Sequence, residues 1–432
     1  MAAAGLLCGL VLLAAGLSSL DGFARGGSRS YGMIAENLVA AGSYSLDGSA
    51  PTAMRPPAYP LLLALAERLG GAEHLAAWAL LLQGAIAAAS LALTALIAHR
   101  LFQSPVAAAL SAALVAANLP LQQEAFVMRE TGLFVLLTLL FVFLTLAPLR
   151  PWLRAVLLAT VSAAGLLTRP GGVVFLPVAA LVLICLSGPA PSRALRPLAT
   201  YALTLCLCLL PWQIYLQSSF GVVSLAGTST GGMNLFKGNH PMMGEIYNLA
   251  DVDWVDPLLH DLLRQAGIDP RGEEWRADAY LRGLAVQSIA ADPARFVRRI
   301  AEKAMAFLSP ANVPVGRAGG VELEDGTLIV QKPVVIVGNL RSVYHLFVIP
   351  LGILGIAGAL LTPGRRLWGL CAGALIAGNV LVYAVTFPEK RYRYPLEPIL
   401  AIATVGVLRR YFSPAAITFE RGEARPPLPD AS

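Results

Sequence analysis

The side chains best suited to acid–base chemistry and anion binding lie in short polar segments between long apolar runs. Glu130 stands at the start of an apolar run, and Asp21 opens the first polar segment, residues 21–60. A positioned carboxylate can act as a general base. Arg169 lies in Thr168-Arg-Pro-Gly171 beside a Pro-Gly turn, and an arginine there can bind a phosphate through two N–H groups. For Glu130, stabilisation by the helix dipole is an alternative, purely structural interpretation.

Two further segments combine cations with amides or aromatic rings. Residues 387–398 place Arg391 and Arg393 beside Tyr392, and residues 228–241 hold a glycine pair with Asn234, Lys237 and Asn239. Arginines next to tyrosines are suited to a lipid phosphate, and backbone N–H groups freed by glycine are suited to a sugar or a phosphate. A solvated charge run and a plain loop are the alternatives for these two segments.

The pattern of residues 21–60 is typical of a loop and a short helix that cover a site. Residues 30–42 have apolar side chains at helical spacing before a glycine, so they predict a short helix. Arg55-Pro-Pro-Ala-Tyr-Pro60 then leads into the next apolar stretch. Tyr31, Arg55 and Tyr59 are the candidates here for substrate binding, although an ordinary solvated connection would also fit.

The composition indicates a polytopic membrane protein. Hydrophobic residues make up 56% of the chain and charged residues only 13%, whereas soluble domains carry about 25% charged residues. The net charge of +6 comes from scattered arginines. These are a topology signal, and they lack the motifs of a nucleic-acid binder, so no nucleic-acid partner is expected. The five cysteines lie in apolar runs and predict neither a zinc site nor a disulfide framework.

Apolar runs of spanning length predict about ten transmembrane helices. Arginines in short loops orient these helices, because cytoplasmic loops carry an excess of Lys and Arg. Both termini are then inside, and every polar segment described above faces outside. The expected spans lie near residues 2–20, 76–98, 105–119, 132–148, 153–168, 172–188, 198–216, 343–361, 367–386 and 395–410.

The expected fold is an all-α polytopic membrane protein with an outer-face α/β segment between its seventh and eighth spans. Residues 293–308 predict an amphipathic helix that could lie in the membrane interface, and 322–337 predict a small hairpin around Asp325-Gly326. The predicted regions are an N-terminal membrane region 1–216 with a first external loop 21–75, an extracytoplasmic segment 217–342, a C-terminal membrane region 343–412 and a cytoplasmic tail 413–432.

The polar segments, in their order, resemble the polyprenol-dependent glycosyltransferases of the GT-C fold. Within that fold they are most similar to bacterial relatives of protein mannosyltransferases and of the lipid A aminoarabinose transferase. The resemblance covers most of residues 20–400, and each motif is modest on its own. The matching stretches are Tyr31 to Gly42, Arg55-Pro-Pro-Ala-Tyr-Pro60, Met128-Arg-Glu-Thr131, Thr168-Arg-Pro-Gly171, Gly231-Gly-Met-Asn-Leu235 with Gly238-Asn239, and Arg391-Tyr-Arg-Tyr-Pro-Leu-Glu-Pro398.

The resemblance implies transfer of a sugar from a polyprenyl phosphate to an acceptor glycan, lipid or protein. A carboxylate would act as base, which assigns Glu130 as the first candidate and Asp21 as the weaker one. Arg391, Arg393, Arg169 and Lys237 would bind the donor phosphate, and Tyr31, Arg55, Tyr59, Asn234, Asn239 and Tyr392 would bind the substrates. The family usually carries an acid three or four residues before the position of Tyr31, where this chain has Gly27 and Ser28.

That departure leaves alternatives open. Asp21 could replace the missing acid, the enzyme could work without it, or the chain could be an inactive member of the family. A lipid-linked-sugar flippase is a further alternative, but ionisable residues are almost absent from the predicted spans, where transporters place them. No ligand cluster decides whether a divalent metal takes part. The resemblance places the protein in the bacterial cytoplasmic membrane, with its site facing the periplasm.

Overall fold

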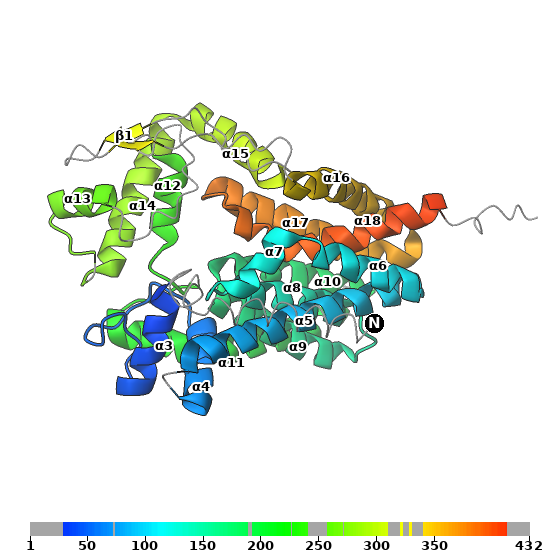
Figure 1. Cartoon of the computed structure of the whole chain (residues 1–432), viewed down its shortest axis with the longest axis horizontal. Coiled ribbons are helices and arrows are strands. Elements are labelled where there is room, and N and C mark those ends of the chain that lie inside the picture. Colours follow the sequence, from blue (N-terminus) through cyan, green and yellow to red (C-terminus); the bar gives the residue numbers. More distant parts are fainter. Residues whose placement is uncertain are drawn as a thin grey trace, which may run out of the picture.

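The computed structural model describes residues 29–71, 74–188, 192–225, 227–240, 257–270, 272–309, 320–322, 328–330 and 340–412. Nine of the ten apolar runs expected to span a membrane are helices here, and the tenth, residues 2–20, lies outside the described part. Figure 1 shows most of these helices running side by side along the molecule. They are α5 (Leu75–Phe102), α6 (Pro105–Ala116), α8 (Thr131–Leu146), α9 (Pro151–Thr168), α10 (Phe175–Leu186), α11 (Ser192–Phe220), α16 (Leu340–Leu360), α17 (Arg366–Val385) and α18 (Glu397–Phe412).

The described helices make this a multi-pass membrane protein. Five of them are long and apolar enough to cross a membrane: α5, α9, α11, α16, and α17 with the turn before it. A sixth span results if α6 is joined across a 65° bend to the stretch that contains α7 (Leu119–Gln123). Helices α8 and α10 are apolar but shorter, so the number of ten spans stays a prediction.

Local sequence signals set several helix ends. Ser104 precedes α6, and its hydroxyl accepts a hydrogen bond from the Ala107 amide, while Pro105 occupies the first turn. Both features favour a helix start. At the end of α3 (Arg29–Ala41), Gly42 adopts φ +65°, a conformation that glycine adopts without strain. The short helix expected over residues 30–42 is therefore confirmed.

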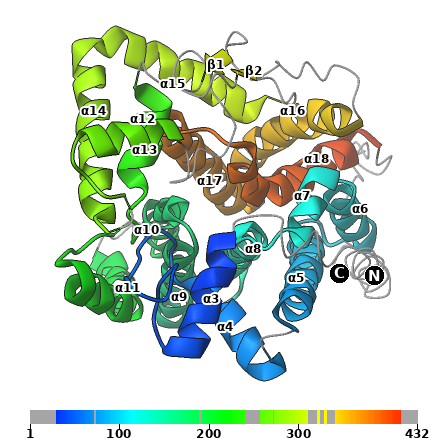
Figure 2. The same cartoon turned by 60° about the vertical axis from the view of Figure 1, so that its left-hand side comes forward.

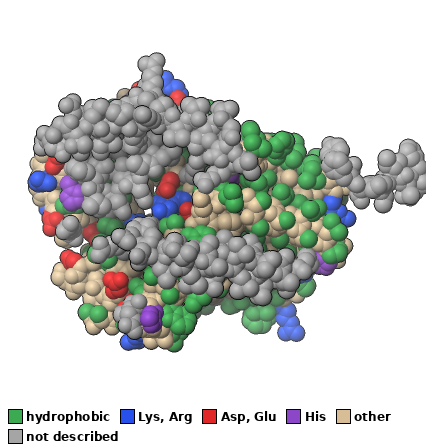
Figure 3. Space-filling model, in the orientation of Figure 1, with side chains coloured by type: hydrophobic (Ala, Val, Ile, Leu, Met, Phe, Trp, Pro, Cys, Tyr) green, Lys and Arg blue, Asp and Glu red, His purple; other side chains and the backbone are tan. Residues whose placement is uncertain are grey.

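Helix α8 lies at the centre of the apolar region, as Figure 2 shows. Phe134 and Phe141 of α8 both stack on Phe175 of α10, with ring centroids 5.4 and 4.9 Å apart. This packing fixes the start of α8, where Glu130 stands. In Figure 3, hydrophobic side chains cover much of the described surface over the apolar helices on the right, and the visible acidic side chains lie on the left and near the centre.

The polar segments form helices grouped at one end of the apolar helices (Figures 1 and 2). Strands β1 and β2 pair in antiparallel fashion, with Val321 opposite Ile329, on either side of the predicted turn at Asp325-Gly326. The elements of this end are α3, α4 (Ala58–Gly70), α12 (Gly231–Asn239), α13 (Pro257–Gln265), α14 (Glu274–Ala291), α15 (Pro293–Leu308), β1 (Gly320–Glu322) and β2 (Leu328–Val330).

The helix expected over residues 293–308 is confirmed as α15, whereas the alternative interpretation of the glycine-containing stretch as a plain loop is wrong. The glycine-containing stretch 228–241 is not a loop, because residues 231–239 form helix α12. Helix α15 packs against α17 and buries a lysine. Lys303 is fully buried, and its Nζ donates to Asn239 Oδ1 at 3.0 Å and to the backbone oxygens of Thr386 and Val385 at 3.1 and 3.3 Å.

A buried carboxylate ties the first polar segment to the later one. Glu274, at the start of α14, accepts hydrogen bonds from the Thr52 hydroxyl, from the Ala53 amide at 2.8 Å and from the Ser229 hydroxyl at 2.9 Å. Burial raises the pKa of Glu274 above its ordinary value, while these three donors oppose the shift. The contacts hold the stretch before Arg55 against the start of α12.

Candidate functional site

A cavity of about 70 Å³ lies where the polar segments meet. All five segments singled out in the sequence contribute to its lining, although they are spread over some 360 residues. Four cations and two carboxylates are among the described lining residues. The lining consists of Tyr31, Met54, Arg55, Pro56, Glu130, Thr168, Arg169, Pro170, Thr228, Thr230, Met233, Asn234, Lys237, Phe387, Glu389, Arg391 and Tyr392.

Glu130 and Arg169 form a buried ion pair in this cavity. Arg169 Nη2 and Nε lie 2.6 and 3.1 Å from Glu130 Oε1, and the two side chains are 5% and 6% exposed. Glu130 makes no capping hydrogen bond to α8, so helix capping does not explain its position. Within the described residues, Glu130 Oε2 and Arg169 Nη1 have no hydrogen-bond partner. The phenols of Tyr31 and Tyr383 are the neighbouring hydroxyl groups of Glu130 and Arg169, respectively.

The charges around Glu130 keep it ionised. Burial alone would raise its pKa, but Arg169 and then Arg391 outweigh burial and hold the pKa well below the ordinary value. Burial works against the charge of Arg169 too, and Glu130 more than compensates, so the pKa of Arg169 is raised. The site thus holds a carboxylate and a guanidinium that are both charged at neutral pH.

The turn before α8 is positioned by a polar side chain from α5. Gln83 Nε2 donates to the backbone oxygens of Val127 at 2.7 Å and Arg129 at 2.9 Å. Gln83 is 1% exposed and lies inside an apolar helix. These bonds satisfy carbonyl groups that would otherwise be buried without donors, and they fix the chain immediately before Glu130.

An aromatic stack supports the cations on the opposite wall. Tyr392 stacks on Tyr383 of α17, with ring centroids 4.3 Å apart. The guanidinium carbons of Arg169 and Arg391 lie 5.0 and 5.4 Å from the centroid of the Tyr392 ring, a cation–π distance. Arg391 also forms an ion pair with Glu389, Nε to Oε2 at 2.7 Å. The stack holds two arginines side by side at the cavity.

Tyr31 and Arg55 form the wall that comes from the first polar segment. The guanidinium carbon of Arg55 lies 5.1 Å from the Tyr31 ring centroid, and Arg55 Nε donates to Ser30 Oγ at 2.9 Å. Burial, and next the charge of Glu130, raise the pKa of Tyr31 well above its ordinary value. Tyr31 therefore stays a neutral phenol next to the carboxylate.

Helix α12 contributes Lys237 and Asn234 to the cavity, but Gly232 serves packing. The amides of Gly232 and Met233 donate to Asp278 Oδ1 at 2.5 and 3.2 Å, so they do not face a ligand. A Cβ on Gly232 would lie 2.0 Å from the Asp278 backbone oxygen. The prediction that glycine frees these amides for phosphate or sugar is therefore wrong.

Eight of the twelve predicted site residues line the cavity, three lie elsewhere, and Asp21 falls outside the described residues. Arg393 pairs with Glu397 at 2.7 Å, and its Nη1 donates to the backbone oxygens of Phe307 and Ser309, at the end of α15. Asn239 donates to Leu235 and Val385 and accepts from Lys303. Tyr59 is fully buried behind Tyr31, with their ring centroids 5.3 Å apart.

Several lining residues were not singled out in the sequence. Glu389 belongs to the charged segment at 387–398, so its carboxylate could have been found from the sequence. The side chains of Met54, Thr168 and Phe387 give no such signal. Among the described residues, no three of His, Cys, Asp and Glu come close enough together to hold a metal ion. Glu130 and Glu389 are the acids of the described lining, and whether a metal takes part stays open.

Comparisons with known proteins give similarities of structure. No family model and no curated protein sequence matches the chain. The archaeal oligosaccharyltransferase AglB from Archaeoglobus fulgidus, in complex with an inhibitory peptide and a dolichol-phosphate, is similar at 12% identity with a TM-score of 0.48. That match covers 90% of this chain and 47% of AglB, so the chain spans about half the length of that enzyme. ArnT from Cupriavidus metallidurans is similar at 17% identity with a TM-score of 0.38, over 94% of this chain and 78% of ArnT. ArnT bound to undecaprenyl phosphate gives 16% identity and a TM-score of 0.39, over 92% and 77% of the two chains.

Proposed function

We propose that the protein is an integral-membrane glycosyltransferase that moves a sugar from a polyprenyl-phosphate donor to an acceptor on the outer face of the membrane. The observation that carries this proposal is the convergence of five sequence segments on one cavity. The resemblance of these segments to GT-C glycosyltransferases implies the same reaction. The cavity combines a buried carboxylate with a wall of cations, which is the pairing that sugar transfer from a phosphate requires.

Arg169, Lys237 and Arg391 bind the donor phosphate in this proposal. Arg55, Arg169, Lys237 and Arg391 outnumber the two carboxylates of the lining, so the described lining carries an excess of positive charge. Arg169 Nη1 is buried without a hydrogen-bond partner among the described residues, and a phosphate oxygen supplies one. Fixed cations of this kind stabilise the negative charge that develops on the departing phosphate.

Glu130 is the proposed general base. The acceptor O–H or N–H gives its proton to Glu130 Oε2, the acceptor atom forms a bond to the anomeric carbon, and the bond from that carbon to the phosphate oxygen breaks. The electron pair leaves with the phosphate. Arg169 weakens Glu130 as a base by lowering its pKa. A donor phosphate that shares Arg169 reduces this effect, so donor binding prepares the base.

Tyr31 and Arg55 form the proposed acceptor side, and Tyr392 supports the donor side through Arg169 and Arg391. The acceptor class, whether lipid, glycan or protein, and the donor sugar stay open. The proposed location is the bacterial cytoplasmic membrane with the cavity facing the periplasm. The described membrane helices carry few buried ionisable groups, which favours a surface enzyme over a flippase.

The test is an incubation of the purified protein in sealed vesicles with polyprenyl phosphates that carry labelled sugars. Extracts of the cell envelope serve as the acceptor pool. Label that moves to an acceptor supports the transferase. Label that only crosses the bilayer identifies a flippase, and label that does neither across a panel of sugars identifies an inactive relative.

A further inference from the structure

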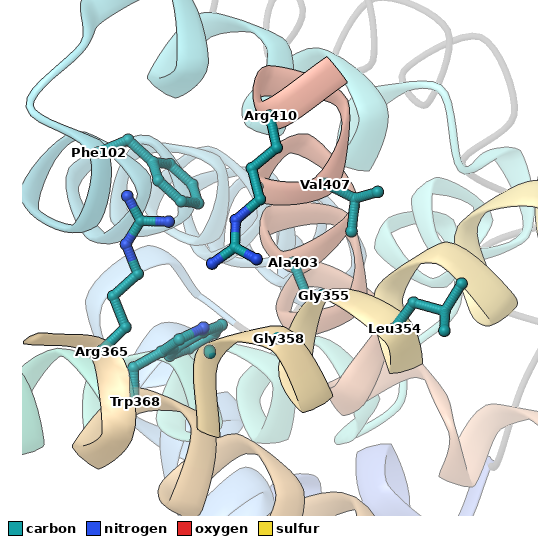
Figure 4. Close-up of a pocket in the computed structure, with 11 residues that line it drawn as sticks. Phe102, Leu354, Gly355, Gly358, Arg365, Trp368, Ala403, Val407 and Arg410 are labelled. Carbon is teal, nitrogen blue, oxygen red and sulfur yellow. The ribbon is translucent and has the colours of Figure 1, made fainter. Parts of the chain in front are cut away.

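A second cavity lies at the opposite ends of the helices that carry the site. Helix α17 begins at Arg366 beside this cavity and ends next to the site, and α18 runs from Glu397 near the site back to Phe412. The cavity has a volume of about 330 Å³ and lies among α5, α16, α17 and α18 (Figure 4). It is therefore separated from the candidate active site by about the length of one of these helices.

Two arginines enter this cavity from different helical segments. Arg365, in the turn before α17, and Arg410, near the end of α18, extend into the same space in Figure 4. The Arg365 guanidinium carbon lies 5.1 Å from the Phe102 ring centroid, and Arg410 Nη2 donates to Thr362 Oγ1 at 2.7 Å. No acid is among the described lining residues. Two positive charges in one cavity repel each other, and a bound anion would relieve the repulsion.

The other wall of the cavity is apolar and lies along the contact between α16 and α18. Leu354, Gly355, Ala403 and Val407 form this wall (Figure 4). A Cβ on Gly355 would lie 2.2 Å from the Ala403 backbone oxygen, so glycine allows the two backbones to approach closely. Leu354 is 61% exposed. In a membrane helix, an exposed leucine beside such a wall faces lipid chains.

We propose that this cavity binds one anionic phospholipid from the adjacent leaflet. The phosphate lies between Arg365 and Arg410, and an acyl chain follows the apolar wall between α16 and α18. Basic pockets between transmembrane helices recognise anionic lipid head groups, and guanidinium groups bind phosphate oxygens through paired N–H bonds. Free phosphate would neutralise the arginines but would leave the apolar wall uncovered. The proposal does not depend on the function proposed for the other cavity.

The test uses the full-length protein in lipid nanodiscs of phosphatidylcholine with a small fraction of phosphatidylglycerol. Native mass spectrometry after release counts the phosphatidylglycerol molecules that stay bound. The test variant is Arg365→Gln/Arg410→Gln, which keeps hydrogen-bond donors at both positions. The control is Arg366→Gln, which removes one positive charge from an exposed neighbour that does not line the cavity. A second variant, Val407→Trp, places a larger side chain on the apolar wall, where it fills space that an acyl chain would occupy. This variant keeps both arginines.

We expect wild type and Arg366→Gln to retain phosphatidylglycerol in preference to phosphatidylcholine. The double variant should bind it roughly thirtyfold more weakly, since each arginine contributes about a five- to sixfold factor near an anionic lipid. Val407→Trp should also lower retention, and this variant decides the question if the double variant does not fold. Equal retention by all variants would refute the site. If millimolar inorganic phosphate stabilises the protein as much as phosphatidylglycerol does, a lipid is refuted as the occupant.

Discussion

Replacing Glu130 and Arg169 by glutamine, singly and together, distinguishes a catalytic ion pair from a structural one. The pair is buried, with Nη2 and Oε1 2.6 Å apart and both side chains at most 6% exposed, so solvent screens it little. Breaking a buried pair on one side costs about 3–5 kcal/mol when the remaining charge has no partner. Glutamine keeps one acceptor or donor in place, so we expect each single variant to lose about 2 kcal/mol of unfolding free energy.

The double variant should recover most of that stability. Two facing amides can hydrogen-bond to each other and leave no buried charge, and replacing both members of a buried pair is often close to neutral. The effect of the substitutions on stability can then be distinguished from their effect on turnover. If Glu130 is the general base, the Glu130→Gln variant loses about 10²–10⁴-fold in turnover, and the double variant stays inactive although its stability returns.

The assays are thermal unfolding in detergent and label transfer from polyprenyl-phosphate sugars. A loss of about 2 kcal/mol leaves a protein of ordinary stability almost entirely folded, so unfolding cannot account for a hundredfold loss of turnover. The matched control is the neighbouring pair Glu124 and Arg129, 3.7 Å apart and outside the lining of the site. Its double glutamine variant should keep wild-type turnover. Wild-type turnover in Glu130→Gln, or recovery of turnover together with stability in the double variant, would refute the base assignment.

Three other predictions concern the cavity and the helices α12 and α15 beside it. Burial, with a contribution from Arg299, lowers the pKa of Lys303 to about 7 from an ordinary value near 10.5. At a pH between these two values, Lys303 is protonated in the unfolded chain but mostly unprotonated in the folded protein. Stability should therefore rise as the pH increases from about 7 to 10; thermal unfolding of Lys303→Met should lose this rise, and an unchanged pH profile would contradict it. Gly238→Ala should destabilise the protein by several kcal/mol, because its Cβ would lie 1.8 Å from the Thr386 backbone oxygen; unchanged thermal unfolding would show that α12 can shift. Arg391→Gln should weaken donor binding roughly ten- to a hundredfold, whereas Glu389→Gln, which removes its ion-pair partner, should not; equal effects on titrated donor affinity would make the pair structural.

The sequence predicted the helices and the polar segments that meet at the cavity, because both depend on local signals. An apolar run of twenty residues becomes a helix wherever it packs, and polar backbone between such runs must lie outside the lipid. The exception is α12. Its glycine pair is typical of turns, and only the structure shows that Gly232 lets the helix lie against the Asp278 backbone oxygen. Tertiary packing, which has no local signal, decided that segment.

The roles of single charged residues were harder to predict, because the role of a charged side chain depends on partners far away in the chain. Arg391 and Arg393 are two residues apart in one motif, yet Arg391 lines the cavity while Arg393 binds the end of α15, 84 residues away. Arg169 was expected to bind phosphate and Glu130 to act as base, and the two are bound to each other across 39 residues. This pairing changes the proposed chemistry. A base that is held ionised by the same arginine that binds the donor gains basicity only when a donor phosphate competes for that arginine, so acceptor activation should follow donor binding.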